Sequence, residues 1–549
     1  MAYSEVDTID IPRSHWTCRH THKTTFNAGK LVPIYFNEDI IPGTTIKLKL
    51  SSVVRMSTPL NPTMDNLKID FFAFRGQKNW YWEHFVNQMG QNDNGAWDDN
   101  QIEYTTPIIK VSPTHPVTSD DLLCYMGVPI GSVGAKVDKL GVNFYQDIWN
   151  NNFRSQPVHA PKIFDKTDAD LETDGTISTG CGLLPVCRNF DYFSSALPAP
   201  QRGSAITTPL GTTAPVVGNG KTLGIWNEQN NKLGALISTN WEHPGSVYAT
   251  TNSIGTNLPI RINPPDNTGW NQDYAIGISK NAESSGLIAD LTQATAATIN
   301  ALRLAFATQR ILEKDALYGT MYRDVLAGQF GTHASSEALM IPELLFAESQ
   351  PINIETVLQQ SQTSENSPLG NTGAFSVTAN VTDAFTKSFS THDMVMILAC
   401  VRVDTHTYAQ GLPRQFTRER RLDHYFPSLA HIGNQPIYNY EIYFQGTSQD
   451  NEVFGYKEAW QEYLYKQNRV SGQFHPNDPL SLDVWTYVDD YGSLPTLSPA
   501  WMEESIYNID RTLAVQSSEA HQFIADFFFE EEISAPIPLH RTPGLIDHY

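Results

Sequence analysis

Residues 31–82 read LVPIYFNEDIIPGTTIKLKLSSVVRMSTPLNPTMDNLKIDFFAFRGQKNWYW, and they hold the two clearest strands of the chain. In 46–50 Ile and Leu alternate with Lys, and in 67–71 Leu, Ile and Phe alternate with Lys and Asp. Neighbouring side chains of a strand point to opposite faces, so each run predicts a strand with one buried face. The residues between the runs break strands and favour turns: Pro59, Asn61 and Pro62. The stretch predicts an antiparallel sheet with a proline-rich corner.

Further strands are predicted towards the C-terminus. The run 394–403 is almost continuously apolar, which is typical of a strand buried on both faces, and 521–529 is another candidate. One long helix is predicted over 290–316, with an apolar stripe on one face and small residues elsewhere that suit packing against a neighbour. The stripe consists of Leu291, Ile299, Leu302 and Phe306. The pattern predicts a mainly β body whose connections have grown large.

The chain has 549 residues, more than one hydrophobic core usually supports, so we expect several domains or one core with large insertions. Residues 1–30 read as a mildly basic N-terminal arm before the first strand. The body is then predicted in two parts, 31–210 and 287–549. Between them, 211–286 contains 10 Gly and 11 Asn with only short apolar groups, so it cannot bury a core of its own. We predict that 211–286 is a surface insertion that projects from the body.

The chain carries 37 basic and 59 acidic residues, a formal net charge of −22. Proteins that neutralise DNA phosphates are basic, so this chain as a whole repels DNA and would need a basic partner to enclose a genome. No apolar run reaches about 18 residues, so we expect no membrane insertion. The N-terminus lacks a basic-then-apolar signal, which favours synthesis in the cytoplasm. Five cysteines, an odd number in so long a chain, predict reduced thiols.

The sequence contains no motif of a catalytic site. Three acid–histidine neighbours occur without a nucleophile motif, and we interpret them as residues that make surface hydrogen bonds: His392 with Asp393, Asp404 with His406, and Asp423 with His424. Cys18, His20 and His22 would share one strand face, but a fourth metal ligand is missing. We therefore predict no catalytic residue, no metal and no cofactor.

The densest basic cluster consists of Arg414, Arg418, Arg420 and Arg421. Aromatic residues lie among these arginines, so the cluster could hold a nucleic-acid backbone and stack bases. The other interpretation is ion pairing to the many carboxylates of this subunit or of a neighbour, and we favour it because charge clusters usually have structural partners. Both interpretations stay open from the sequence.

Several segments resemble, in matching order, the major capsid proteins of microviruses, in particular of the gokushovirus branch. They are TTFNAGKLVPIYFNEDIIPG (24–43), PTMDNLKIDFFAF (62–74), NFDYFSSALPAPQRG (189–203), ATAATINALRLAFATQRILEKDALYGTMY (294–322) and LAHIGNQPIYNYEIY (429–443). The resemblance implies an eight-stranded antiparallel jelly-roll β-barrel with large inserted loops and a few helices. It also implies a T=1 icosahedral homo-oligomer, with five-, three- and two-fold contacts, around a circular single-stranded DNA genome.

The resemblance carries expectations about partners. Family members contain a small basic internal DNA-binding protein, and their insertion near 211–286 gathers into spikes on the three-fold axes. Host attachment through a surface receptor is then expected from the insertion, with Trp226, Trp241 and Trp270 as candidate contacts. The protein would be a virion component that assembles in the cytoplasm of the bacterial host.

One rival hypothesis belongs to another class of protein. A cytosolic carbohydrate-binding or carbohydrate-active β-sandwich would use a pair of carboxylates and exposed tryptophans around a cleft. No pair of acidic residues stands out in the sequence, so this hypothesis ranks second.

Overall fold

The structure is a computed structural model of the whole chain. It describes residues 11–92, 102–204, 206, 216–218, 224–227, 232–235, 276–278, 287–289, 299–361, 363 and 369–540. The architecture is mainly β, and the large sheets are antiparallel. Two four-stranded sheets dominate, and neither closes into a barrel.

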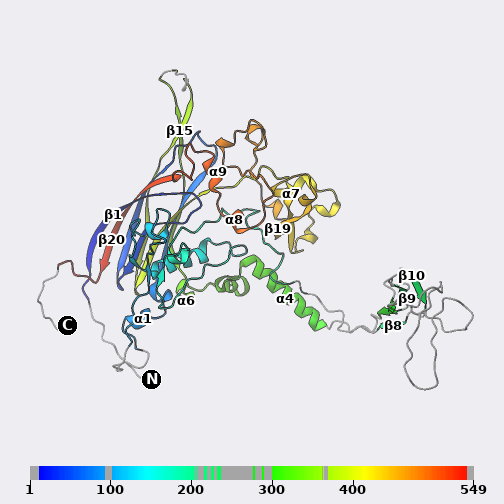
Figure 1. Cartoon of the computed structure of the whole chain (residues 1–549), viewed down its shortest axis with the longest axis horizontal. Helices are drawn as coiled ribbons and strands as arrows, with labels where there is room; N and C mark the ends of the chain where they lie inside the picture. The colour runs from blue at the N-terminus through cyan, green and yellow to red at the C-terminus, as the bar shows by residue number, and fades with distance from the viewer. Residues whose placement is uncertain are drawn as a thin grey trace, which may run out of the picture. The chain divides into compact units, whose positions relative to one another are not determined.

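The first sheet joins strands from both ends of the chain. Its order is β1-β20-β3-β16, with β1 at Ser14–Phe26, β20 at Phe523–Ala535, β3 at Thr45–Met56 and β16 at Thr378–Ser388. Thirteen residue pairs connect β1 to β20, from Ser14 opposite Ala535 to Phe26 opposite Phe523. Figure 1 shows these two strands, blue and red, lying side by side at one edge.

The second sheet has the order β13-β4-β17-β2. Its strands are β13 (Glu343–Pro351), β4 (Leu67–Gln77), β17 (Asp393–Val403) and β2 (Val32–Ile40). In β17 every residue except Arg402 is buried, so the prediction of a strand covered on both faces is confirmed. The alternation explains this result, because odd-numbered residues from Val395 to Val403 enter one core and even-numbered residues from Met394 to Cys400 enter another.

The first core lies between the two sheets. Phe71 of β4 and Phe527 of β20 meet edge to face, with ring centroids 6.0 Å apart, and both are fully buried. The second core covers the outer face of the second sheet. There Phe74 of β4 packs with Tyr145 and Trp149 beneath a helix. The second sheet is therefore the middle layer of the body.

One helix covers the second core. It consists of α3 (Lys139–Ile148) and a π-helical turn, η2 (Trp149–Phe153), and Asp138 caps its start by accepting a hydrogen bond from Leu140 N at 2.6 Å. Among the described residues one other α-helix is long, α4 (Ile299–Tyr318) with 20 residues. The remaining α-helices are single turns or little more: α1 (Phe85–Gln88), α2 (Leu122–Tyr125), α5 (Tyr322–Val325), α6 (Ser336–Leu339), α7 (Asn439–Ile442), α8 (Pro499–Met502) and α9 (Ile506–Asp510). No described helix has the length and apolarity that crossing a membrane requires.

The predicted strands 46–50, 67–71, 394–403 and 521–529 are confirmed by β3, β4, β17 and β20. One expectation about them is wrong, because β3 and β4 are not paired but belong to different sheets. The proline-rich connection between them is too long for a tight hairpin and carries the chain from one sheet to the other. It is held by distant backbone: Met64 N donates to Trp485 O at 2.7 Å.

The expected arm 1–30 also needs correction, since it contains strand β1. This strand was missed because its half-buried positions include polar residues such as Cys18 and His22, so apolar alternation is weak. Its strand conformation is stabilised by the ladder to β20, whose residues lie between 497 and 521 positions away in the sequence.

A third hydrophobic cluster builds a lobe from the segment 187–196 and from the loops after β17. It contains Tyr192, Phe193, Tyr408, Phe454 and Trp501. The small sheet of β18 (Asn434–Tyr438) and β19 (Val453–Glu458) contributes to it, and α7 and α8 supply buried Ile442 and Met502. A further small sheet joins β5 (Ile108–Lys110), β6 (Lys136–Asp138) and β7 (Leu171–Glu172).

A second compact unit comprises Gly203–Leu312, and the remaining residues form the first unit. In it β8 (Val216–Gly218) pairs with β12 (Leu287–Ala289), and β9 (Gly224–Asn227) pairs with β10 (Lys232–Ala235) and β11 (Ile276–Ile278). The predicted insertion 211–286 falls within this unit. Its surface position, like the other predicted domain limits, stays a prediction.

Candidate functional site

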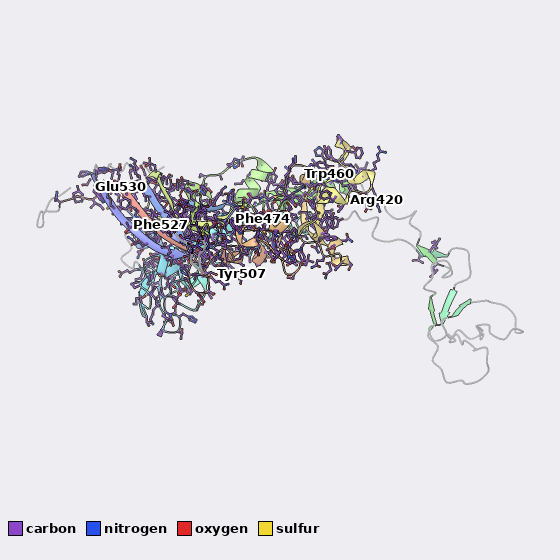
Figure 2. All side chains as sticks on the ribbon, turned by 90° about the horizontal axis from the view of Figure 1, so that it is seen from above. Arg420, Trp460, Phe474, Tyr507, Phe527 and Glu530 are labelled. Atoms are coloured by element: carbon purple, nitrogen blue, oxygen red, sulfur yellow. The ribbon has the colours of Figure 1, made fainter. Side chains whose placement is uncertain are left out.

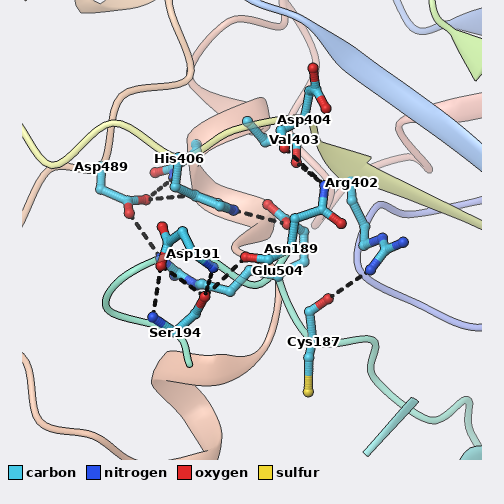
Figure 3. A network of polar contacts seen from close by, with 12 residues as sticks. Cys187, Asn189, Asp191, Ser194, Arg402, Val403, Asp404, His406, Asp489 and Glu504 are labelled. Carbon is cyan, nitrogen blue, oxygen red and sulfur yellow. Dashed lines mark hydrogen bonds and ion pairs between the residues drawn. The ribbon is translucent and has the colours of Figure 1, made fainter. Parts of the chain in front are cut away.

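The most buried group of charges in the first unit lies where the second sheet meets the lobe. We call Arg188, His406, Asp489 and Glu504 the junction cluster, and none of the four is more than 5% exposed. His406 Nε2 lies 3.1 Å from Glu504 Oε2, and its Nδ1 lies 3.5 Å from Asp489 Oδ1. Arg188 Nη1 donates to Asp489 Oδ2 at 2.9 Å. Figure 3 shows His406 between the two carboxylates.

The electrostatics of the junction cluster favour charged groups in spite of burial. Burial alone would lower the pKa of His406, but the carboxylates of Glu504 and Asp489 outweigh it and raise that pKa to about 9. Burial would likewise raise the pKa of Asp489, yet Arg188 and His406 hold it far below its usual range. With His406 protonated, two cations face two carboxylates and the cluster is neutral. Loss of one charge would leave another buried without compensation.

Neighbouring side chains complete the hydrogen bonding of Asp489. Tyr491 Oη donates to its Oδ2 at 3.1 Å, and Asn508 Nδ2 donates to its Oδ1. Trp501 Nε1 in turn donates to Tyr491 Oη at 3.0 Å, and the Arg188 guanidinium lies over the Trp501 ring at 4.7 Å. The hydrogen bonds to Asp489 hold together the loops that carry these side chains.

The segment after Arg188 ties the end of β17 to the lobe. Asn189 Nδ2 donates to the carbonyls of Val403, at 3.1 Å, and Asp404, at 2.9 Å. Asp191 Oδ1 accepts the backbone N–H of Ser194 at 2.7 Å, and Asp191 Oδ2 accepts Tyr408 Oη at 2.7 Å. These contacts, drawn in part in Figure 3, make 189–194 a structural connector.

Among the described residues, the two members of each acid–histidine neighbour do not form an ion pair with each other. Asp404 forms an ion pair with Lys68, while His406 turns to Glu504 and Asp489. The neighbouring carboxylate of Asp393 accepts from Arg75 Nε at 3.1 Å. Asp423 accepts the backbone N–H groups of Glu419 and Arg420. Each carboxylate thus has a structural partner.

The Cys18, His20 and His22 positions do share one face of β1. His22 Nδ1 lies 2.7 Å from the carbonyl of Ile34, and His20 Nδ1 lies 3.5 Å from Glu531 Oε1. Among the described residues, no three His, Cys, Asp or Glu side chains gather as ligands of a metal ion.

The four arginines of the basic cluster separate into two kinds. Arg414 Nη1 lies 3.4 Å from Glu441 Oε1, and Arg418 Nη2 lies 3.1 Å from Glu462 Oε1, so both pair with buried carboxylates. Arg420 and Arg421 are exposed, and Figure 2 shows Arg420 beside Trp460 at the lobe, far from Glu530 of the first sheet. Among the described residues neither Arg420 nor Arg421 forms an ion pair, so this second pair is available to contact a partner.

The predicted apolar stripe lies partly on α4 (Ile299–Tyr318). Leu291 is outside the described residues, whereas Ile299, Leu302 and Phe306 are all exposed in the single chain. The expected packing against a neighbour stays a prediction. Of the candidate host contacts, Trp241 and Trp270 lie outside the described residues, and Trp226 is described only as a backbone position in β9.

Sequence reasoning did not find the junction cluster. Its members come from four segments up to 316 residues apart, between Arg188 and Glu504, and none belongs to a recognisable spacing. The one available signal was the acid–histidine neighbour Asp404 with His406, which marked His406 without showing its partners.

Comparison with known proteins places the whole chain among viral coat proteins. A family model described as "Capsid protein (F protein)" matches residues 4–545. The chain is 34% identical over 555 residues to capsid protein VP1 of Spiroplasma virus 4, covering 97% of this chain and 96% of that protein. It is 29% identical to VP1 of Chlamydia phage 1, with 99% and 97% coverage, and 30% identical to VP1 of Bdellovibrio phage phiMH2K, with 100% and 98% coverage.

The junction cluster predicts that the folded chain loses stability at alkaline pH. The pKa of His406 is about 9 when folded, against roughly 6.5 in an unfolded chain, so the native state binds the extra proton between these values. Its contribution is complete below pH 6.5 and is lost as pH rises through 9, by on the order of 3 kcal/mol. Urea unfolding from pH 6 to 10 should show this decline.

His406→Gln should be less stable at pH 6 and should show a flatter dependence on pH than the unchanged chain. The exposed His333→Gln is the matched control and should keep the full decline. An equal decline in His406→Gln would contradict this role for the junction cluster.

Proposed function

This chain belongs to the F-type capsid protein family, in the gokushovirus branch of the microviruses, and we propose that its copies close into a T=1 icosahedral shell around a circular single-stranded DNA genome. It is a major capsid protein and a component of the virion. The observation that carries the proposal is the similarity to coat proteins over nearly the full length of the chain. The rival hypothesis of a carbohydrate-binding β-sandwich has no support. We also propose that assembly takes place in the cytoplasm of the bacterial host.

Strand pairing supports the finer proposal that the body is a jelly roll. If the eight long strands are numbered 1 to 8 in chain order, the sheets read 1-8-3-6 and 5-4-7-2. Strand 1 therefore pairs with 8, 2 with 7, 3 with 6 and 4 with 5, all antiparallel. This is the pairing that a long folded-over hairpin gives when it rolls into two packed sheets, the arrangement of jelly-roll coat proteins.

Closed symmetry requires that each copy present complementary surfaces to its neighbours around five-, three- and two-fold axes. We propose that α4 supplies one such surface, because its apolar side chains are exposed in the single chain. Contact with a second copy would bury them.

Leu302→Asp tests this proposal. A charge without a partner in an apolar contact costs several kcal/mol, so the variant should fold but fail to form particles in a sedimentation assay. The exposed His333→Gln, used above, serves as the assembly-competent control. Normal particle yield from Leu302→Asp would show that this part of α4 stays in solvent after assembly.

Net charge constrains how the genome is held. A shell of many copies, each of formal charge −22, repels a polyanion, so we propose that a small basic internal protein lies between shell and DNA. We further propose that Arg420 and Arg421 face the nucleic acid. In support, both are exposed and the Arg421 guanidinium lies 5.5 Å from the Phe426 ring centroid, a combination suited to phosphate contact and base stacking.

Purified full particles should contain single-stranded DNA and a basic polypeptide besides this chain, as detected by mass spectrometry. Full particles made only of this chain and DNA would refute the proposed partner. Particles of Arg420→Ala/Arg421→Ala should contain less DNA, judged by the ratio of absorbance at 260 and 280 nm. The control Arg414→Ala removes a cation that already has a carboxylate partner, Glu441, and any loss of yield there reports folding.

The insertion 211–286 is proposed to contact the host as a protrusion at the three-fold axes. Supporting features are its abundance of Gly and Asn and its position within a separate compact unit, Gly203–Leu312. Loop-closure entropy rises by only about 0.6 kcal/mol per doubling of length, so the body tolerates a long excursion. The alternative is a clamp buried between subunits.

Replacement of 213–284 by a short Gly-Ser linker distinguishes protrusion from clamp. We expect particles that assemble with a smooth surface but do not infect, because the body keeps its cores and loses only the receptor contact. The measurement combines electron micrographs with an infectivity titre. Failure of a folded deletion variant to assemble would mean that the segment is part of the shell.

A further inference from the structure

The hairpin of β14 (Ile354–Leu358) and β15 (Thr372–Ser376) pairs with no other strand among the described residues. Figure 1 shows it extending away from the two large sheets, while Ile354 at its base packs against the first core. Gln359 extends it, since its N–H donates to Asn371 O at 2.9 Å and its carbonyl accepts Gly370 N at 2.8 Å. A hairpin alone is marginally stable in water, so an ordered arm of this kind is best explained by a partner.

Both faces of the hairpin carry exposed apolar side chains. Directly paired residues point to the same face, so Glu355, Phe375 and Val357 share one face. Phe375 is 43% exposed and Val357 46%. Leu358, on the other face, is 50% exposed. Apolar side chains are thus exposed on both faces, whereas a hairpin packed on its own body would bury the apolar side chains of one face.

The charges of the hairpin limit what can cover it. Between 351 and 377 the ionisable residues are Glu355 and Glu365, with no Lys or Arg. A surface without cations does not bind phosphates, so neither nucleic acid nor an anionic membrane fits. The hairpin is complementary to a protein surface that is apolar and carries a cation without an ion-pair partner.

Such a surface exists on this chain beside the edge strand β1. A cavity of about 560 Å³ is lined by Val53, Ile130 and Ile524, all three exposed apolar residues. Two cations also line it. Lys23 lies 3.5 Å from Asp526, whereas Arg55 has no ion-pair partner among the described residues. The cavity thus offers apolar contact and one uncompensated positive charge.

We propose that the β14–β15 hairpin of one copy docks in the β1 cavity of a second copy. Val357 and Phe375 then contact the apolar lining, and Glu355 pairs with Arg55. The two surfaces are different, so the contact is heterologous and repeats around a rotation axis until the ring closes. This inference rests on the proposed shell and names one contact that builds it.

A charge exchange tests the proposed pair. Glu355→Arg and Arg55→Glu should each reduce the particle yield at least about tenfold, because like charges placed face to face at an interface cost several kcal/mol. The double variant should recover most of the yield, since the pair is restored with reversed sign. Circular dichroism checks that each chain is folded, and Glu519→Arg, an exposed charge reversal elsewhere, is the matched control.

Cross-linking gives a second measurement, because the native thiol of Cys124 also lines the cavity. Val357→Cys particles treated with a short bismaleimide should yield a two-chain product joined at residues 357 and 124, identified by peptide mass spectrometry. Val357→Cys/Cys124→Ser should lose this product. A link between 357 and 124 within one chain would contradict docking between copies.

The outcomes separate this inference from the proposed shell. If the unchanged chain and Glu519→Arg form particles and folded Glu355→Arg does so equally, the docking proposal is wrong and the shell stands. If both single reversals block assembly and the double variant does not recover, the hairpin and the cavity are each needed for assembly but do not contact each other. The docking proposal is then wrong. Absence of particles from the unchanged chain would refute the shell itself.

Discussion

Burial of the second sheet on both faces is the constraint on which the rest of the body depends. The alternating side chains of β17 enter two different hydrophobic cores, so one strand connects the first sheet to the helix α3. Apolar burial contributes roughly 25 cal/mol per Å², which makes a strand covered on both sides a large stabilising element. At one end of this layer, Arg75 bridges the buried carboxylate of Asp393 to Glu343 of β13, and this pairing satisfies the charges that the burial would otherwise isolate.

The junction cluster is a consequence of the same arrangement. The chain leaves β17 at Val403 and is buried again from His406 to Tyr408, so the polar groups of this buried segment need internal partners. Asn189 supplies them to the backbone, and the junction cluster balances charge around His406. The loops, the β14–β15 hairpin and α4 carry exposed apolar residues instead. These residues suit contact with other copies.

The local pattern of apolar residues was sufficient to predict those strands whose own residues alternate or are continuously apolar. The apolar run of β17 and the alternation of β3 and β4 were read directly, whereas β1 was missed because it depends on pairing with β20. The sheet to which each strand belongs could not be predicted from the sequence. The proline-rich connection after β3 does not indicate which sheet the next strand joins. The junction cluster was invisible for the same reason, as Arg188 and Asp489 meet only in the folded chain. For the arginine cluster, the favoured ion-pair interpretation describes Arg414 and Arg418 but leaves Arg420 and Arg421 exposed.

The central claim is that this acidic, mainly β chain is built to close with its own copies into a shell. Electron microscopy of the purified protein tests that claim most directly. The account predicts isometric particles of a single diameter, whose class averages show five-, three- and two-fold symmetry. Discrete monomers at all concentrations, with the chain fully folded, would contradict it.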